Sequence, residues 1–93
     1  MGHFADFRCR GCRYEEVDLG VGHGRKPTPV LKLFRCDHCH SVGSTWVQEG
    51  RVTRCSFCYH DEPVLLADDV TALACPKCQA PGVVTHRRDA TWE

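Results

Sequence analysis

The eight cysteines of this 93-residue chain fall into four pairs with one spacing, C-x-x-C, and no cysteine is left over. A tight turn between two cysteines aims both sulfurs at one point about 2.3 Å from a shared metal ion, and two such turns complete a tetrahedron. We call each turn a knuckle. Eight thiolates predict two four-cysteine metal sites, with the ligands Cys9, Cys12, Cys36, Cys39, Cys55, Cys58, Cys75 and Cys78.

Four soft ligands with no open position suit a closed, structural zinc site, so two Zn²⁺ ions are the predicted cofactors. Iron is the chemical alternative, because the ligands are the same. A disulfide framework would need an oxidising compartment. Residues 1–6 lack the basic and apolar regions of an export signal, so we expect a cytoplasmic protein with reduced thiols.

The composition leaves little apolar material for a core. The apolar fraction is 42%, but it includes the eight cysteines, and the large aliphatic residues are ten valines, six leucines and one methionine, with no isoleucine. A zinc finger gains about 10–16 kcal/mol of folding free energy from each structural zinc ion. We therefore expect the metal, rather than the core, to hold this fold together. The longest apolar runs have four residues, which excludes a membrane-spanning helix.

Short β-rich runs lie between the knuckles and must position them. Strands are predicted within residues 17–19, 30–34, 42–47, 63–66, 70–74 and 83–86, with a turn at Asp68-Asp69. Residues 65–74 also fit a short helix, because Leu66, Val70 and Leu73 recur at helical spacing. The β-branched residues favour strands. The predicted fold class is a small, metal-stabilised, mostly β protein made of two zinc-ribbon units packed in one chain.

The knuckles resemble those of the zinc ribbons, a family that overlaps with rubredoxin-like folds. In that family two C-x-x-C knuckles, each at the tip of a β-hairpin, clamp one zinc ion. The resemblance covers residues 4–48 and 52–88, and Cys75-Pro76-Lys77-Cys78 is nearest the family's C-P-x-C form. The first half looks like small bacterial ribbon proteins, which implies a fold and a metal but no activity. The family often has glycine after the second cysteine, where this chain has Arg13, His40, Tyr59 and Gln79.

Three pairings of the knuckles are open. Joining consecutive knuckles closes the shortest loops, and we expect it: residues 1–50 would form a ribbon with Cys9, Cys12, Cys36 and Cys39, and residues 51–93 a ribbon with Cys55, Cys58, Cys75 and Cys78. A RING-type cross-brace has only two or three residues between its middle pairs, whereas 15 separate Cys39 from Cys55. A nested pairing resembles the cysteine-rich region of Hsp40 chaperones, but their C-x-x-C-x-G-x-G repeat is missing here.

Six histidines accompany the cysteines. His38, His40 and His60 lie within two residues of a cysteine and could replace it at a metal. With eight cysteines supplied this is unnecessary, so we expect these three to be solvated or to donate toward a sulfur. We expect the other three on the surface, at His3, His23 and His86.

The charge is balanced over the whole chain and uneven along it. Residues 1–58 carry nine basic and six acidic residues, and residues 59–93 carry three and six. The basic part also contains five aromatic residues, Phe4, Phe7, Tyr14, Phe34 and Trp46. Exposed aromatic residues among basic ones suit single-stranded nucleic acid, here through Arg8, Arg10, Arg13, Arg25, Lys26, Lys32 and Arg35. Filling two zinc–tetrathiolate sites would take the net charge to about −4, which argues against strong non-specific binding.

We expect a small binding or adaptor module with a protein partner, with no enzyme activity and no membrane contact. One enzyme-like pattern, His60-Asp61-Glu62 before the last knuckle, departs from the zinc-deaminase signature, because Ala74 stands where that signature has proline. The alternatives are a nucleic-acid-binding ribbon protein of transcription or translation, and a rubredoxin-like redox or metal-transfer protein.

Overall fold

The computed structural model describes residues 2–92, of which the regular structure is all β, with 54% strand and no helix. Seven strands follow one another along the chain: β1 (Gly2–Cys9), β2 (Glu15–Val21), β3 (Val30–Cys36), β4 (Ser41–Val47), β5 (Val64–Leu65), β6 (Ala72–Ala74) and β7 (Pro81–Trp92). None of the described residues forms a helix of the length and apolarity that a membrane crossing requires.

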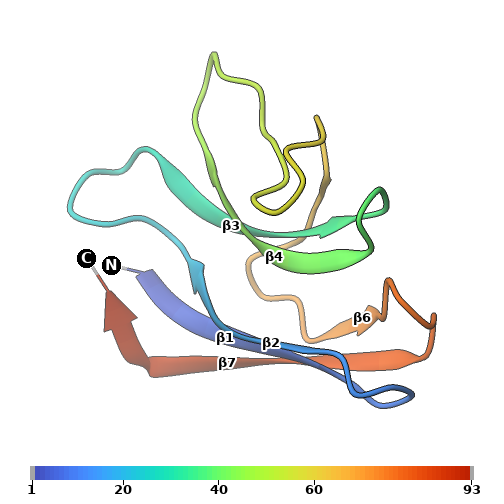
Figure 1. Cartoon of the computed structure of the whole chain (residues 1–93). Coiled ribbons are helices and arrows are strands. Elements are labelled where there is room, and N and C mark those ends of the chain that lie inside the picture. The colour runs from blue at the N-terminus through green and yellow to red at the C-terminus, as the bar shows by residue number, and fades with distance from the viewer. Residues whose placement is uncertain (1, 93) are drawn as a thin grey trace.

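The larger sheet has the antiparallel order β2-β1-β7-β6. The first and last strands of the chain are therefore neighbours, in a register that runs from Gly2 opposite Trp92 to Cys9 opposite Gly82, with one irregularity after His3. Figure 1 shows β1, β2 and β7 as one layer, with β6 at its edge. This pairing brings the knuckle that follows β1 beside the knuckle that precedes β7.

The smaller sheet has the order β4-β3-β5 and forms the second layer (Figure 1). Successive side chains of a strand point to opposite faces. In β3 Leu33 joins the core between the two sheets, while Phe34 packs on the other side against Cys36 and Cys55. Because both faces of β3 are buried, its sequence is a nearly unbroken apolar run rather than an alternating one.

The main core lies between the sheets. The larger sheet contributes Ala5, Phe7, Leu19, Val21 and Val84, and the smaller sheet contributes Leu33 and Val42. At Gly82 an added Cβ would come within 2.6 Å of the Phe7 ring and 2.7 Å of the Leu73 carbonyl oxygen. Glycine at this position therefore lets β7 approach both of its neighbours.

Most of the predicted strands are confirmed, and residues 65–74 form no helix. The runs at 63–66 and 70–74 give only the short strands β5 and β6. The strand β1 was not predicted, although Ala5 and Phe7 are buried and alternate with Asp6 and Arg8. The last strand extends six residues beyond its predicted end, to Trp92.

Candidate metal centres

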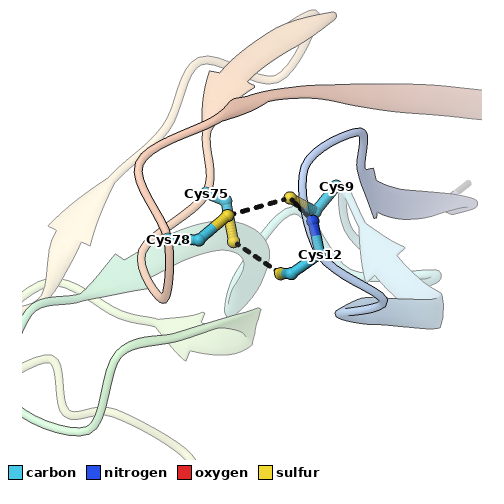
Figure 2. A group of neighbouring side chains, drawn as sticks. All are labelled: Cys9, Cys12, Cys75 and Cys78. Atoms are coloured by element: carbon cyan, nitrogen blue, oxygen red, sulfur yellow. Dashed lines mark hydrogen bonds between the residues drawn. The ribbon is translucent and has the colours of Figure 1, made fainter.

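The first and fourth knuckles bring four cysteines together into what we call the outer cluster: Cys9, Cys12, Cys75 and Cys78. Figure 2 shows the two knuckles facing each other, with their sulfurs converging. The Sγ atoms of Cys9 and Cys78 are 3.4 Å apart, and those of Cys12 and Cys75 are 3.8 Å apart. One sulfur of this cluster belongs to a buried residue, Cys75, and one to an exposed residue, Cys78.

The second and third knuckles form the inner cluster: Cys36, Cys39, Cys55 and Cys58. Here the Sγ–Sγ distance is 3.7 Å from Cys36 to Cys58 and 3.6 Å from Cys39 to Cys55. Both Cys36 and Cys55 are buried, and they pack against Phe34. This cluster is therefore part of a small core of its own.

The sulfur spacing fits one metal ion in each cluster. Four sulfurs placed about 2.3 Å from a central ion in a tetrahedron lie about 3.8 Å from one another. All four sulfurs of each cluster lie within 4.8 Å of one another, and the closest pairs are 3.4–3.8 Å apart. All eight cysteines are free thiols, well beyond the roughly 2.05 Å of a disulfide. Both clusters can therefore hold a metal ion.

Backbone hydrogen bonds shape each knuckle around its first cysteine. The amides of Gly11 and Cys12 both donate to the Cys9 sulfur at 3.2 Å. In the third and fourth knuckles Phe57 and Lys77 donate in the same way at 3.4 Å, to Cys55 and Cys75. Such donors stabilise the thiolate that a metal ion requires.

The backbone reverses direction immediately after the second cysteine. Three residues there have a positive φ, namely His40 at 56°, Tyr59 at 61° and Gln79 at 66°. These are the positions where the zinc-ribbon family often has glycine. Arg13 occupies the same place in the first knuckle but has no positive φ. Three knuckles therefore adopt the left-handed conformation without glycine, and the first knuckle closes differently.

The thiol pKa values are split within each cluster. Desolvation raises the pKa of Cys9, but the amides of Cys12 and Gly11 lower it more, so that it falls to about 6. In the same cluster the Ala80 amide lowers the pKa of Cys78, but the adjacent Cys9 sulfur and desolvation together raise it to about 12. In the inner cluster desolvation raises the pKa of Cys36, but the amides of Cys39 and His38 outweigh it and bring the pKa to about 7. Each cluster thus offers a ready thiolate as its first ligand.

The predicted pairing of consecutive knuckles is wrong. Cys9 and Cys12 lie with Cys75 and Cys78, not with Cys36 and Cys39, so the pairing is nested. The physical reason is the pairing of β1 with β7, which crosses the predicted boundary at residue 50 and places Cys9 opposite Gly82. Residues 30–65, with the inner cluster, are inserted between the two hairpins that carry the outer cluster.

The histidines divide into two groups. His38 and His60 are exposed and stack in parallel at 4.5 Å between ring centroids, and His40 lies 3.2 Å from the carbonyl oxygen of Pro76, so it links the two clusters. His23 is exposed, as predicted. The prediction for His3 and His86 is wrong: both are half-buried and lie 3.0 Å apart through their ring nitrogens.

The seven basic residues predicted to meet nucleic acid do not share one surface. Arg8, Lys32 and Arg35 pair with Glu15, Asp68 and Asp37. The first knuckle, which carries Arg10 and Arg13, lies at one end of the molecule, and the loop with Arg25 and Lys26 lies at the other (Figure 1). Of the seven, Arg25 and Lys26 line a large hollow, together with Trp46, one of the aromatic residues named with them, and Trp92, which the sequence did not single out.

Comparison with protein-family models, with curated proteins and with solved structures gives no match. The geometry of the two clusters therefore carries the functional conclusion.

Proposed function

We propose that this protein binds two zinc ions in structural four-cysteine sites, each clamped by two zinc-ribbon knuckles, and that it acts as a small binding module. The observation that supports the proposal is the convergence of four sulfurs in each cluster, with closest spacings of 3.4–3.8 Å. This spacing agrees with the edge of a zinc–sulfur tetrahedron, about 3.8 Å.

We assign zinc rather than iron because each cluster connects separate elements of the fold, which is a structural role. The outer cluster ties β1 to the β6–β7 hairpin, and the inner cluster ties the β3–β4 hairpin to residues 55–58. Zn²⁺ has no redox chemistry, and a closed site of four thiolates is its usual structural form. When bound, the ion supplies the cross-link that a core of so few large aliphatic residues does not.

A binding role is assigned over catalysis because every sulfur is used. Four thiolates complete a tetrahedral shell, whereas a catalytic zinc site keeps a position open for water or substrate. The eight reduced cysteines suit a cytoplasmic protein. A protein partner of such a module would meet the surface outside the clusters.

The test is the metal content of the purified native protein. We expect native mass spectrometry to give the chain plus two zinc ions, and the denatured protein to titrate eight free thiols without reductant. A coloured protein that contains iron would overturn the choice of zinc. A metal-free protein whose mass shows disulfides would overturn both sites.

A further inference from the structure

Two hollows meet at one exposed tryptophan of β4. The first has a volume of about 540 Å³ and the second about 590 Å³, and both are lined by Trp46 and Pro29. The first continues along the loop at 24–28 to Trp92, and the second continues past residues 51–56 to Tyr59. We call the combined lining the Trp46 platform.

Two aromatic side chains of the platform are exposed, Trp46 and Tyr59, and Trp46 packs against a third ring, that of Trp92. Trp46 is 53% exposed and meets Trp92 edge-to-face, at 5.7 Å between ring centroids and 89° between planes. Trp92 is itself fixed, because its Nε1–H donates to the His3 carbonyl at 3.0 Å. At the far end Tyr59 is 71% exposed, just after the third knuckle. Flat ring surfaces are therefore available on both sides of the platform.

Among the described residues, every charged side chain that lines the platform is cationic. Its two hollows are lined by four cationic residues, and no described acidic residue lines either of them, although the chain has as many acids as bases. Two of the cations lie on each side of Trp46: Arg25 and Lys26 on one, Arg51 and Arg54 on the other. Arg54 also pairs with Asp61 at 3.0 Å, and both side chains are largely exposed.

We propose that the Trp46 platform binds single-stranded nucleic acid, with bases stacked on Trp46 and Tyr59 and the phosphates beside the flanking cations. Exposed aromatic rings within a positively charged groove are how proteins bind single strands without reading their sequence. A duplex keeps its base faces stacked inside, so it offers nothing to these rings. Two hollows in succession suit a strand of several nucleotides better than one nucleotide.

This inference rests on the proposed function, because the inner cluster positions part of the platform. Cys55 lines the second hollow, and Arg54 and Tyr59 flank its knuckle. The binding protein must therefore be the zinc-loaded chain. A metal analysis of the same sample separates a failure of the zinc sites from a failure of the platform.

The experiment is a titration of the zinc-loaded full chain into fluorescein-labelled oligothymidylate and oligouridylate, over a range of salt concentrations. Stacking contributes about 5- to 150-fold in affinity for each base, so Trp46→Ala should weaken binding by that factor and Trp46→Phe by less. Lys26→Gln and Arg51→Gln should each lower the slope of log affinity against log salt concentration by about 0.7. The matched control is Arg8→Gln. Arg8 is exposed, as Lys26 and Arg51 are, but it pairs with Glu15 in the larger sheet.

Support would be binding that Trp46→Ala, Lys26→Gln and Arg51→Gln weaken and that Arg8→Gln leaves unchanged. Three results would overturn the proposal: no binding by the zinc-loaded protein at low salt, equal losses in Arg8→Gln and Lys26→Gln, or equal affinity for duplex or mononucleotide. Lys26 and Arg51 are exposed, so their variants test the platform even if Trp46→Ala does not fold. Preference for the uridylate or the thymidylate strand distinguishes RNA from DNA.

Discussion

The Tyr14 hydroxyl accepts a hydrogen bond from the Val42 amide at 2.8 Å and donates to the Val42 carbonyl at 3.4 Å. This one side chain joins the end of the first knuckle to the edge strand β4 of the other sheet. Desolvation raises the pKa of Tyr14 to about 12, so the phenol keeps its proton and can make both bonds at once. Lys77, from the fourth knuckle, lies 4.9 Å from the Tyr14 ring centroid.

Tyr14→Phe should destabilise the protein by about 1–3 kcal/mol, because it leaves the buried Val42 amide without its acceptor. The measurement is the free energy of unfolding in urea, with zinc present. The matched control is Tyr59→Phe, since the exposed Tyr59 hydroxyl makes no hydrogen bond to any described residue and should change stability by less than about 0.5 kcal/mol. Equal effects of the two substitutions would contradict a role for the Tyr14 bond.

The nested pairing makes a prediction about metal stoichiometry in double variants. The double variant Cys9→Ser/Cys75→Ser should bind one zinc ion fewer than the wild type, because both cysteines belong to the outer cluster. The double variant Cys9→Ser/Cys36→Ser should lose both zinc ions, because each substitution removes a ligand from a different cluster. Pairing of consecutive knuckles predicts the reverse result, so native mass spectrometry of the two variants separates the arrangements directly.

The left-handed residues after the knuckles predict a stabilising substitution. Gln79→Gly should stabilise the zinc-bound protein by about 0.5–1 kcal/mol, because a side chain at positive φ costs more than the extra freedom of glycine in the unfolded chain. Arg13→Gly is the matched control: Arg13 has no positive φ, so glycine there should cost about 0.5–1 kcal/mol. Urea unfolding of both variants should give shifts of opposite sign.

The His3–His86 contact predicts a loss of stability in mild acid. The Nε2–H of His86 donates to the Val70 carbonyl at 2.6 Å, so its Nδ1 is left to accept from His3. Burial lowers the pKa of His3 below its usual 6.5, helped by the charges of Arg88 and His86 and opposed by Asp68. The folded state therefore binds the proton less readily than the unfolded chain, and the contribution of His3 is complete above pH 6.5 and declines below it.

The measurement is the free energy of unfolding between about pH 7.5 and about pH 5.5 in the wild type and in His3→Gln. Zinc sites also weaken in acid, because protons compete for the thiolates. This weakening of the zinc sites is common to the wild type and His3→Gln. The difference between their curves of unfolding free energy against pH therefore isolates the contribution of His3. Parallel curves would show that the histidine contact does not titrate with folding.

Much of the site could be predicted from spacing, because a C-x-x-C knuckle is a local structure. The residues that converge in the two clusters are the eight predicted cysteines, and the strands beside the knuckles follow from runs such as residues 42–47. The pairing could not be predicted from loop lengths. The loop-closure costs of the consecutive and nested arrangements differ by only about 1 kcal/mol, and the pairing of β1 with β7 along the whole of β1 outweighs that difference.

The alternation of apolar Ala5 and Phe7 with polar Asp6 and Arg8 was the signal that would have shown β1, and with it a partner for the long final strand. The signal for the Trp46 platform was weaker, because Trp46 was one of five aromatic residues among the basic ones and the sequence does not distinguish which of them are exposed. Whether Trp46 fills a core or faces solvent depends on which side of β4 meets the other sheet, and that is decided by tertiary packing. The sequence alone also could not show that Lys26 and Arg51 lie on opposite sides of the Trp46 ring.

The inner cluster lies in the sequence between the two knuckles of the outer cluster, so the two sites can bind their metal ions in a fixed order during synthesis. The inner knuckles are close in sequence, with Cys39 and Cys55 separated by 16 positions, whereas Cys12 and Cys75 are separated by 63. On a ribosome the third knuckle emerges before the fourth, so the inner site can capture its ion while the fourth knuckle is still inside the exit tunnel. The outer site can close only after that knuckle emerges, so the last metal ion to bind fastens the first knuckle to the fourth.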